Sequence, residues 1–385
     1  MEKNKIKICH ITSAHERDDT RIFQKECKSL SSVGYQVYML VNDSMPSEEV
    51  GGVNIISTNI EPKNRLERFI KTKRKMLELA LKIDAKIYQF HDPDLIGFAL
   101  KLKKKKPNIK IVFDSHEDIP AQILKKEWIP AIFRKLVSKC FEKYQNTTLK
   151  KFDYLVGVTP HLVEKLKKIN NNVEMVTNYP LLEKENDEII EEKEIIRSNG
   201  SICFAGGISK QWNHHIILQA LEEMDIKYIL CGSGDEEYLK ELKKYTSWNK
   251  VDYKGKIPFE KVKRVYQEAQ MGIALLAYSP NTDYKQGTLG NTKIFEFMQA
   301  GIPIICTDFV LWKEIVAKNG CGICVNPTDI EAIRNAIEYL SNNPEICKSM
   351  GQNGKKLVDE ELNWNSQFCK LAKVYNELLC GAEEC

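Results

Sequence analysis

Polar side chains follow two apolar runs in the N-terminal half, at the points where buried strands would end. His91 and Asp92 come directly after the run KIYQF, and His116 comes just after KIVFD. In an open parallel sheet, ligands bind beyond the carboxyl ends of the strands. We therefore expect His91, Asp92 and His116 to face one crevice, in which a ligand would bind. The alternative for each histidine is a structural role, capping a helix or satisfying a buried carbonyl group.

A second signal is the stretch QGTLGNTKIFEFMQAG at residues 286–301, in which a glycine-bearing loop leads into a helix starting near Thr292. Backbone N–H groups at the start of a helix favour a phosphate, and Lys293 adds a positive charge there. Glu296, one turn further, is placed to accept hydrogen bonds from sugar or ribose hydroxyls. In the structural alternative Thr292 is only an N-cap and Glu296 its capping partner. That alternative explains the helix start but not the glycines and the lysine together.

Several other kinds of site are disfavoured. A dinucleotide site requires G-x-G-x-x-G after the first strand, but the segment there is SAHERDDTR, without glycine. No P-loop motif occurs. The acidic and histidine residues of 91–94 and 114–118 are the nearest approach to a metal cluster, and we interpret them as polar loops at strand ends. Cys321 and Cys324 form a lone C-x-x-C pair, and the twelve cysteines are interpreted as reduced. We expect no cofactor and no metal.

The elements that must position these residues alternate between strands and helices, which predicts parallel βαβ units. The predicted strands cover residues 6–12, 35–41, 85–90, 109–113, 154–158, 173–176, 201–205, 226–231, 251–253, 271–276 and 302–306. The predicted helices cover residues 20–32, 65–83, 95–104, 131–149, a segment opening at Pro160, 211–224, 235–245, 294–300, 311–317, 330–342 and 364–379.

The acidic stretch at residues 183–199 interrupts this alternation and predicts two doubly wound α/β domains with a ligand cleft between them. We divide the chain into an N-terminal domain (1–180), an acidic linker region (181–199), a second domain (200–362) and a C-terminal helix (363–385). That last helix is expected to pack back toward the N-terminal domain.

Charge is distributed unevenly over the 385 residues. Residues 1–180 contain 33 Lys and Arg against 22 Asp and Glu, whereas the remainder contains 24 against 31. The basic half predicts contact with something anionic: nucleic acid, acidic lipid or a phosphorylated substrate. Nucleic acid is disfavoured because no basic pattern interleaved with aromatic residues occurs. No apolar run approaches the ~20 residues of a membrane span. We expect a cytoplasmic protein, held at the inner face of the membrane by the lysine runs at 63–75 and 101–106.

In combination, several stretches resemble glycosyltransferase family 4, of the type active in bacterial polysaccharide biosynthesis. They are HERDDTRIFQKE, HDPDL at 91–95, FDSHEDIP at 113–120, FAGGIS at 204–209, KGKIP at 254–258, NTKIFEFMQAGIPIICTDF at 291–309 and CGICVNPTD at 321–329. The resemblance implies the GT-B fold, two facing Rossmann-like domains with a central cleft. It also implies metal-independent transfer of a sugar, of the hexosyltransferase kind, with retention of anomeric configuration.

The resemblance assigns roles residue by residue. His116 matches the histidine at the donor sugar, Glu296 the glutamate near the ribose, and Lys256 with Ile257 the turn at the nucleotide base. The catalytic set is then His116, Asp92, Lys293 and Glu296. The remaining expected donor contacts are Gly206, Gly207, Lys210, Gly232, Thr288, Leu289, Gly290, Asn291 and Thr292; Asp19, Arg21 and His91 are expected on the acceptor side.

Three departures from the family pattern stand out. Thr288 replaces the first of the two family glutamates, and Gly207 and Trp212 stand where basic residues often clamp the diphosphate. Lys293 or Lys210 would have to act instead. The expected reaction transfers a sugar from a UDP- or GDP-linked donor to a glycan or a polyprenyl-linked saccharide. Two alternatives stay open: a sugar-nucleotide epimerase on the same fold, and a non-catalytic scaffold that binds nucleotide sugars.

Overall fold

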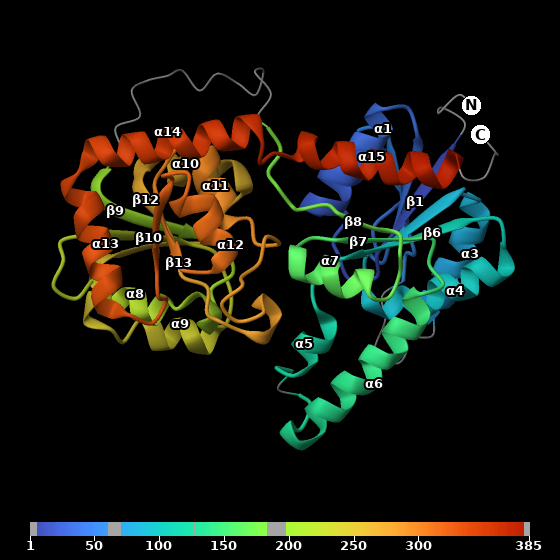
Figure 1. Cartoon of the computed structure of the whole chain (residues 1–385), viewed down its shortest axis with the longest axis horizontal. Coiled ribbons are helices and arrows are strands. Elements are labelled where there is room, and N and C mark those ends of the chain that lie inside the picture. Colours follow the sequence, from blue (N-terminus) through green and yellow to red (C-terminus); the bar gives the residue numbers. More distant parts are fainter. Residues whose placement is uncertain (1–5, 61–70, 127, 183–197, 381–385) are drawn as a thin grey trace. The chain divides into compact units, whose positions relative to one another are not determined.

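The chain folds into two compact units. The computed structural model describes residues 6–60, 71–126, 128–182 and 198–380 (Figure 1). The first unit comprises Met1–Asn178 and Asn365–Cys385, and the second Tyr179–Trp364. The domain boundaries that we expect from the sequence, after residues 180 and 362, lie close to the boundaries of these units, after residues 178 and 364. Most of the expected linker, residues 183–197, lies outside the described residues.

The first unit is built on an eight-stranded sheet in the order β3-β4-β2-β1-β5-β6-β7-β8. All neighbours in it pair in parallel except β3 and β4. The strands are β1 (Lys7–Ile11), β2 (Gln36–Val41), β3 (Glu48–Val50), β4 (Val53–Ser57), β5 (Ile87–Phe90), β6 (Lys110–Ser115), β7 (Tyr154–Gly157) and β8 (Val173–Met175). The strand order reverses between β1 and β5, so a topological switch point lies at their carboxyl ends.

Helices cover this sheet, and the last helix of the chain returns to it (Figure 1). They are α1 (Lys28–Ser32), α3 (Lys73–Ile83), α4 (Ile96–Lys105), α5 (Ile119–Ile123), α6 (Ala131–Leu149), α7 (Pro160–Lys167) and α15 (Trp364–Cys380), with a 3-10 turn at Pro93–Leu95. Residues 65–70 of the predicted helix 65–83 lie outside the described ranges. The segment predicted as one helix, 20–32, is a π-helix over Thr20–Cys27 that continues into α1.

The second unit contains a six-stranded, wholly parallel sheet in the order β11-β10-β9-β12-β13-β14. Its strands are β9 (Ser198–Ala205), β10 (Lys227–Cys231), β11 (Val251–Gly255), β12 (Ala269–Ala274), β13 (Ile304–Thr307) and β14 (Gly322–Val325). Its helices are α8 (His214–Ala220), α9 (Glu236–Leu242), α10 (Phe259–Glu268), α11 (Lys293–Gln299), α12 (Val310–Trp312), α13 (Ile330–Asn342) and α14 (Pro344–Glu360), and a short π-helix covers Lys313–Ala317. Here the order reverses between β9 and β12.

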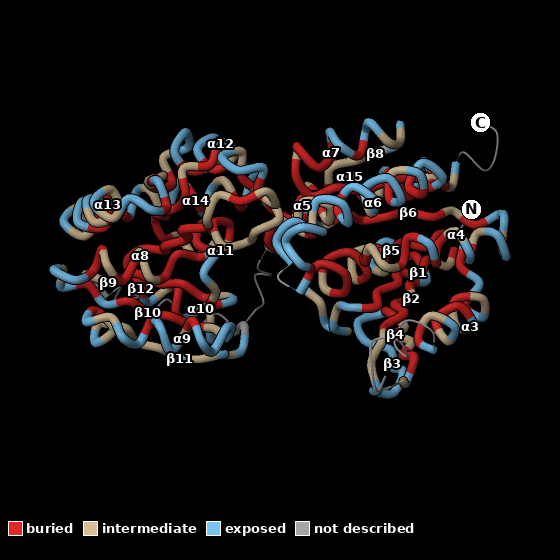
Figure 2. The backbone as a smooth tube through the Cα atoms, turned by 90° about the horizontal axis from the view of Figure 1, so that it is seen from below, coloured by how far each residue is buried: buried red, intermediate tan, exposed pale blue. Residues whose placement is uncertain are grey.

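The central strands β5 and β12 are buried along their whole length, and β1 and β9 are buried from Ile8 to Ile11 and from Ser201 to Ala205, as their continuous apolar runs predict (Figure 2). The predicted helix 211–224 is shorter than expected, because Asn213 adopts a left-handed conformation with φ 49° and α8 starts only after it. Among the described residues, no helix combines the length and the apolar character needed to cross a bilayer.

Candidate active site

At the switch point of the first unit, Asp92 organises the loop that follows β1. Its Oδ2 accepts hydrogen bonds from Thr12 Oγ1 and from the Ser13 backbone N–H, both at 2.7 Å. His15 Nε2 lies 3.6 Å from its other oxygen. Asp92 is buried, so these contacts hold the ends of β1 and β5 together. The structure thus places Asp92 at the expected edge, bonded to protein groups.

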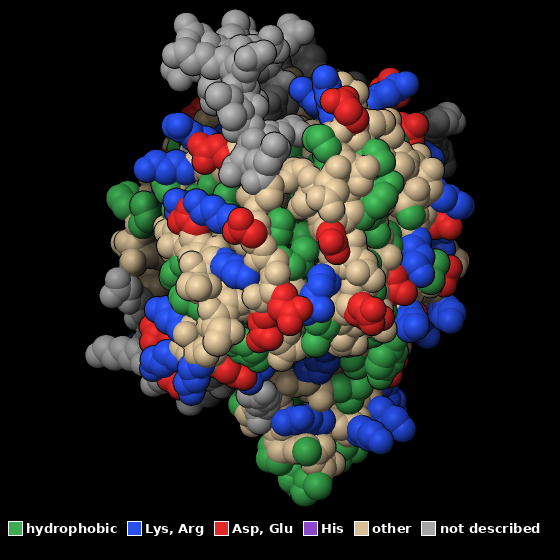
Figure 3. Space-filling view, turned by 90° about the vertical axis from the view of Figure 1, so that its left-hand side faces the viewer, with side chains coloured by type: hydrophobic (Ala, Val, Ile, Leu, Met, Phe, Trp, Pro, Cys, Tyr) green, Lys and Arg blue, Asp and Glu red, His purple; other side chains and the backbone are tan. Residues whose placement is uncertain are grey.

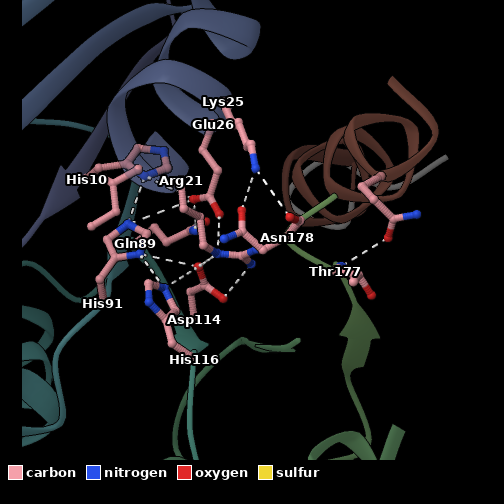
Figure 4. A network of polar contacts seen from close by, with 12 residues as sticks. His10, Arg21, Lys25, Glu26, Gln89, His91, Asp114, His116, Thr177 and Asn178 are labelled. Atoms are coloured by element: carbon pink, nitrogen blue, oxygen red, sulfur yellow. Dashed lines mark hydrogen bonds and ion pairs between the residues drawn. The ribbon is translucent and has the colours of Figure 1, made fainter. Parts of the chain in front are cut away.

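A buried ion pair lies beneath this edge (Figure 4). Arg21, 4% exposed, donates from Nε and Nη2 to the two oxygens of Asp114, each at 2.9 Å. Glu26 Oε1 lies 3.1 Å from Arg21 Nε, and Glu26 Oε2 accepts a hydrogen bond from Gln89 Nε2 at 2.7 Å. The bidentate geometry matches the planar guanidinium to one carboxylate, which is the arrangement that best compensates a buried charge pair.

Three histidines extend from this ion pair (Figure 4). His116 Nε2 lies 2.9 Å from Asp114 Oδ2, and His91 Nδ1 lies 3.3 Å from the same oxygen. His91 Nε2 is 3.0 Å from His10 Nδ1. The Tyr375 hydroxyl, on α15, is 3.2 Å from His10 Nε2 and donates to Gln89 Oε1 at 2.6 Å. A continuous polar chain therefore runs from α15 to the carboxyl end of β6.

The charges of this cluster follow from its burial. Burial alone raises the pKa of Asp114, but Arg21 and His116 outweigh it and hold that pKa well below its usual range. Burial, together with the nearby charge of Asp114, raises the pKa of Glu26 well above its usual range. Burial also lowers the pKa of His10 and of His91. One cation, Arg21, is thus balanced by one anion, Asp114, while these shifts favour the neutral forms of Glu26, His10 and His91.

An ionised Asp114 fixes the histidine tautomers, because a carboxylate only accepts hydrogen bonds. His116 Nε2–H and His91 Nδ1–H then both donate to it. His91 Nε2 accepts from His10 Nδ1–H, which leaves a lone pair on His10 Nε2, 3.2 Å from the Tyr375 oxygen; the single proton of that hydroxyl can go to this nitrogen or to Gln89 Oε1. In the neutral form of His116, Nδ1 carries a lone pair because Nε2–H donates to Asp114. The His116 side chain is 21% exposed, so this lone pair is the part of the cluster placed to meet a substrate hydroxyl.

Of the three residues expected on the acceptor side, two are buried and the third caps a helix. Arg21 and His91 are buried in the interior network, where they bond to protein groups, and their contact with an acceptor stays a prediction. Asp19 caps the π-helix, accepting from the backbone N–H groups of Arg21 and Ile22, and its other oxygen is 3.0 Å from His15 Nδ1. That pairing raises the pKa of His15 above its usual value.

Two sets of potential metal ligands occur among the described residues. One is His10, Glu26 and His91, and the other is His91, Asp114 and His116; their ligand atoms lie within 4.8 Å of one another. Both oxygens of Asp114 already accept hydrogen bonds from Arg21, so a cation in the second set would have to share this carboxylate with the guanidinium. The C-x-x-C cysteines form no such set: Cys324 Sγ lies 3.6 Å from Cys306 Sγ on the neighbouring strand.

In the second unit, glycines bring the loops after β9, β10 and β11 together. Gly206 N–H donates to Cys231 O at 3.0 Å, and Gly232 N–H donates to Gly255 O at 2.7 Å. A Cβ on Gly232, whose φ is +133°, would lie 1.8 Å from Gly206 O. Only glycine at this position permits such close approach of two backbones. The resulting edge exposes main-chain groups rather than long side chains.

The start of α11 faces this edge. A Cβ on Gly206 would lie 3.1 Å from Lys293 Cε. Lys293 Nζ is 2.7 Å from Glu296 Oε2, which also accepts the Tyr266 hydroxyl at 2.7 Å. The Thr292 hydroxyl donates to the other oxygen of Glu296. Burial raises the pKa of Glu296, but Lys293 and these donors outweigh it and hold the carboxylate ionised. Thr292 therefore supports Glu296 instead of capping the helix.

Most of the other residues expected to contact the donor lie in the loop before α11. Around α11, Asn291 Oδ1 accepts from Lys293 N–H at 3.3 Å and Thr288 Oγ1 accepts from Gly290 N–H at 3.1 Å, while Leu289 is buried. Lys210 lies away from this loop: its Nζ forms an ion pair with Glu241 of α9, at 3.1 Å.

Trp212 and the turn after β11 complete the set of expected positions. Trp212 packs against Phe204 in the core, so it offers no group to a diphosphate. In the turn after β11, Lys256 is exposed and Ile257 packs on the core. Gly207 has open space where a Cβ would lie.

Sequence reasoning missed several residues that the structure brings to these edges. His10 lies within the apolar run ICHI, where an isolated polar residue is a signal of a buried interaction, whereas Glu26 lies in the polar stretch QKECK and carried no such signal. Tyr266 and Tyr375 carried no comparable signal. They are ordinary aromatic positions of α10 and α15, and their partners are distant in the sequence.

Comparison with known proteins agrees with this architecture. The family model described as "Glycosyltransferase Family 4" matches residues 21–178, and the model "Glycosyl transferases group 1" matches residues 185–357. The chain is 25% identical over 304 residues to an uncharacterized glycosyltransferase of Methanocaldococcus jannaschii, covering 76% of this chain and 74% of that protein.

Solved structures share the fold. Sucrose-phosphate synthase from Thermosynechococcus elongatus superimposes with a TM-score of 0.76 at 15% identity, over 98% of this chain and 100% of that one. Anabaena HepE in complex with UDP and glucose gives a TM-score of 0.68 at 12% identity, over 97% and 100%. With the two family models matching successive parts of the chain, the protein belongs to the glycosyltransferases of the family 4 type, with the GT-B fold.

Proposed function

We propose that this glycosyltransferase transfers a hexose from a UDP- or GDP-linked donor, with retention of anomeric configuration, to a glycan or lipid-linked saccharide of the cell envelope. The observation that carries the proposal is the arrangement of Lys293 and Glu296 against Gly206. It combines a cation for a diphosphate with an ionised carboxylate for ribose hydroxyls, beside a backbone that a ligand can approach closely. HepE, which has the same fold, was solved with UDP and glucose.

In this proposal the second unit binds the donor. Lys293 stabilises the charge that develops on the departing diphosphate, the largest electrostatic requirement of the reaction. Because Trp212 is buried and Lys210 pairs with Glu241, Lys293 is the lysine we assign to this role. Glu296, fixed by Tyr266 and Thr292, accepts hydrogen bonds from the ribose. The backbone at Lys256 and Ile257 contacts the base.

His116 of the first unit acts on the donor sugar. Its Nε2 is held by Asp114, so Nδ1 accepts a hydrogen bond from a sugar hydroxyl and orients the ring for attack. The acceptor proton passes to the departing phosphate oxygen, so no side-chain base is required. No metal enters this scheme, and transfer that is lost with EDTA and restored by a divalent cation would contradict that part of it.

The proposal places the enzyme in the cytoplasm, at the inner face of the membrane, where a polyprenyl-linked acceptor would be found. An epimerase would interconvert UDP-sugars in the absence of an acceptor, whereas the proposed transferase only hydrolyses them slowly. A non-catalytic scaffold would bind nucleotide without turnover.

The decisive experiment measures UDP and GDP affinity by calorimetry in Lys293→Ala. A charge-assisted contact contributes about 1.5–3 kcal/mol, so we expect the dissociation constant to rise about 10- to 100-fold. Lys285→Ala is the matched control, because Lys285 is an exposed lysine of the same loop. Equal affinities in the two variants would refute the phosphate role of Lys293.

A second measurement separates binding from chemistry. In His116→Ala we expect nucleotide affinity to be retained and sugar transfer to fall about 100-fold or more. The anomeric configuration of the product, read by NMR, tests retention directly. An inverted product, or near-normal turnover in His116→Ala, would remove the corresponding part of the mechanism.

A further inference from the structure

Helix α6 of the first unit is amphipathic in the reverse sense. The side chains that it buries are mainly polar: Ser138, Gln145 and Thr148, together with Leu149. Its large apolar side chains face solvent instead, with Ile132 81% exposed and Leu136 61% exposed. At 3.6 residues per turn, these two sets lie on roughly opposite sides of the helix. Because α6 packs on its own unit by its polar face, its apolar face is available to bind a partner outside the chain.

Six exposed large apolar side chains lie close together in the sequence around the N-terminal end of α6. They are Leu124, Trp128, Ile132, Phe133, Leu136 and Val137, which we call the α5–α6 apolar tip. Trp128 is 70% exposed. In Figure 1, α6 runs away from the sheet of its unit with this end farthest from it, and in Figure 3 hydrophobic side chains gather at the lower end of the view. A projecting apolar tip of this kind indicates an interaction surface.

Basic residues surround the tip. Residues 119–151 contain eight Lys and Arg and two Asp and Glu. Lys135, Lys139 and Lys143 line one flank of the apolar face and are exposed, and none of the ion pairs found between described residues involves them. Apolar and aromatic side chains flanked by uncompensated lysines are the composition of helices that lie in the interface of an anionic bilayer.

The two lysine runs from which we predicted a membrane contact, at 63–75 and 101–106, are less suited than this tip to bind an anionic membrane surface. Lys103 is 2.5 Å from Asp153, Lys106 pairs with Asp84, and Lys73 is 3.2 Å from Asp94. These cations are already compensated by carboxylates, and no exposed large hydrophobic side chain occurs on α4. Residues 63–70 of the first run lie outside the described ranges.

We infer that the α5–α6 apolar tip inserts into the surface of an anionic lipid bilayer, with Lys135, Lys139 and Lys143 contacting the headgroups. A second copy of the chain is a poorer occupant, because pairing two such tips would bring their lysines together. The inference does not depend on the transfer reaction, since binding to lipid requires neither donor nor acceptor.

Tryptophan fluorescence supplies a local probe. Trp212, Trp312 and Trp364 are buried and Trp248 is half-buried, so Trp128 is the exposed indole of the five. On adding phosphatidylglycerol-containing vesicles, we expect the emission to shift to the blue and the protein to sediment with the vesicles. Trp128→Phe should lose the shift but still sediment.

The variants locate the surface. Ile132→Ser/Leu136→Ser should lower the vesicle partition constant more than about tenfold. Val310→Ser is the matched control, because it removes an exposed apolar side chain from the second unit and should bind as the wild type does. Lys135→Glu/Lys139→Glu should remove the preference for anionic over neutral vesicles. Unchanged circular dichroism and melting temperature in every variant would show that folding is intact.

Three outcomes would overturn the inference. They are equal binding of the wild type to phosphatidylcholine and phosphatidylglycerol vesicles, equal binding of Ile132→Ser/Leu136→Ser and Val310→Ser, and a wild-type dimer that binds no vesicles and that Ile132→Ser/Leu136→Ser converts to a monomer. Loss of nucleotide binding in Lys293→Ala with intact vesicle binding would leave the inference standing. The two proposals therefore fail separately.

Discussion

The two units present different edges at their switch points, although both are doubly wound parallel sheets. In the first unit the edge rests on buried charged and polar side chains, centred on Asp114 and Arg21. In the second it consists mainly of glycine backbone, with the single pair Lys293–Glu296 beside it. One topology thus supports an edge made by side chains and another made by main chain.

This difference predicts where each edge is sensitive. A side-chain network fails when one partner of a buried charge pair is removed. A backbone edge fails when a Cβ is added, and it tolerates changes in side chains that do not take part. Substitutions of matched size in the two units therefore test whether the edges are built as described.

The largest effect is expected from Asp114→Ala. It leaves the Arg21 guanidinium buried without its carboxylate, which typically costs about 3–5 kcal/mol of unfolding free energy. Glu48→Ala is the control: it removes an exposed carboxylate from Arg17, which keeps its partner Asp43, and should cost less than about 1 kcal/mol. Urea denaturation followed by circular dichroism measures both. Similar losses in the two variants would mean that the buried pair contributes no more than a surface pair.

Gly232→Ala is expected to be next. The new Cβ would meet Gly206 O, and the residue would be held at a positive φ, so we expect a loss of about 1–3 kcal/mol together with weaker nucleotide binding. Gly207→Ala adds the same methyl group in open space and should change stability by less than about 0.5 kcal/mol. If both variants behave alike, the close approach of the two loops does not limit the second edge.

Much of the fold was predictable because its signal is local. Continuous apolar runs such as SICFA and YILC are typical of strands buried on both faces, and the structure has β9 and β10 there. The errors occur where local sequence does not decide. The antiparallel pair β3–β4 has exposed residues on β3, and α14 was not recognised at all. The break at Asn213 depends on one residue adopting a left-handed conformation.

The candidate site was predictable only where residues follow strands. His116 and Asp92 follow strands of the first unit and Lys293 and Glu296 begin a helix of the second, so the sequence alone predicts that each pair lies at the ligand edge of its own sheet. The Arg21–Asp114 pair could not be found in this way, since its partners are far apart in sequence and only the fold joins them. Thr288 and Trp212 looked like defects of the family pattern, yet both make defined contacts, with Gly290 N–H and Phe204 respectively.

The pH dependence of the free energy of unfolding gives a third comparison between the two units. Burial lowers the pKa of His214, in the second unit, to about 3. Between about pH 6.5 and 3 the unfolded chain binds a proton there that the folded chain does not, so stability falls as the pH falls, by about 1.4 kcal/mol per pH unit well below 6.5. In the first unit the lowered pKa values of His10 and His91 act in the same direction, while the raised pKa of Glu26 acts in the opposite one.

His214→Phe/Tyr228→Phe tests this assignment, because it removes the histidine together with the hydroxyl 2.8 Å from its Nδ1. Denaturation curves between pH 4.5 and 7 should show a shallower pH dependence than in the wild type. A slope equal to that of the wild type would mean that His214 is not the group that titrates on unfolding.

The smallest effects concern one tyrosine hydroxyl at each edge. Tyr375 bonds to side chains, Gln89 and His10, whereas Tyr253 donates to the Gly232 carbonyl at 3.1 Å. Each Tyr→Phe substitution should cost about 1 kcal/mol of unfolding free energy, since each removes neutral hydrogen bonds.

The two substitutions should differ in their effect on the histidine tautomers of the first unit. In Tyr375→Phe the hydroxyl beside His10 Nε2 is absent, so that nitrogen loses its polar neighbour and the tautomers of His10 and His91 are no longer biased from that end. Nitrogen-15 NMR of labelled histidines should then show mixed tautomers, but only Nδ1–H forms of His10 and His91 in Tyr253→Phe and in the wild type. If the histidine spectra of Tyr375→Phe match those of the wild type, Asp114 alone orders the chain, and α15 contributes stability without influencing the edge at His116.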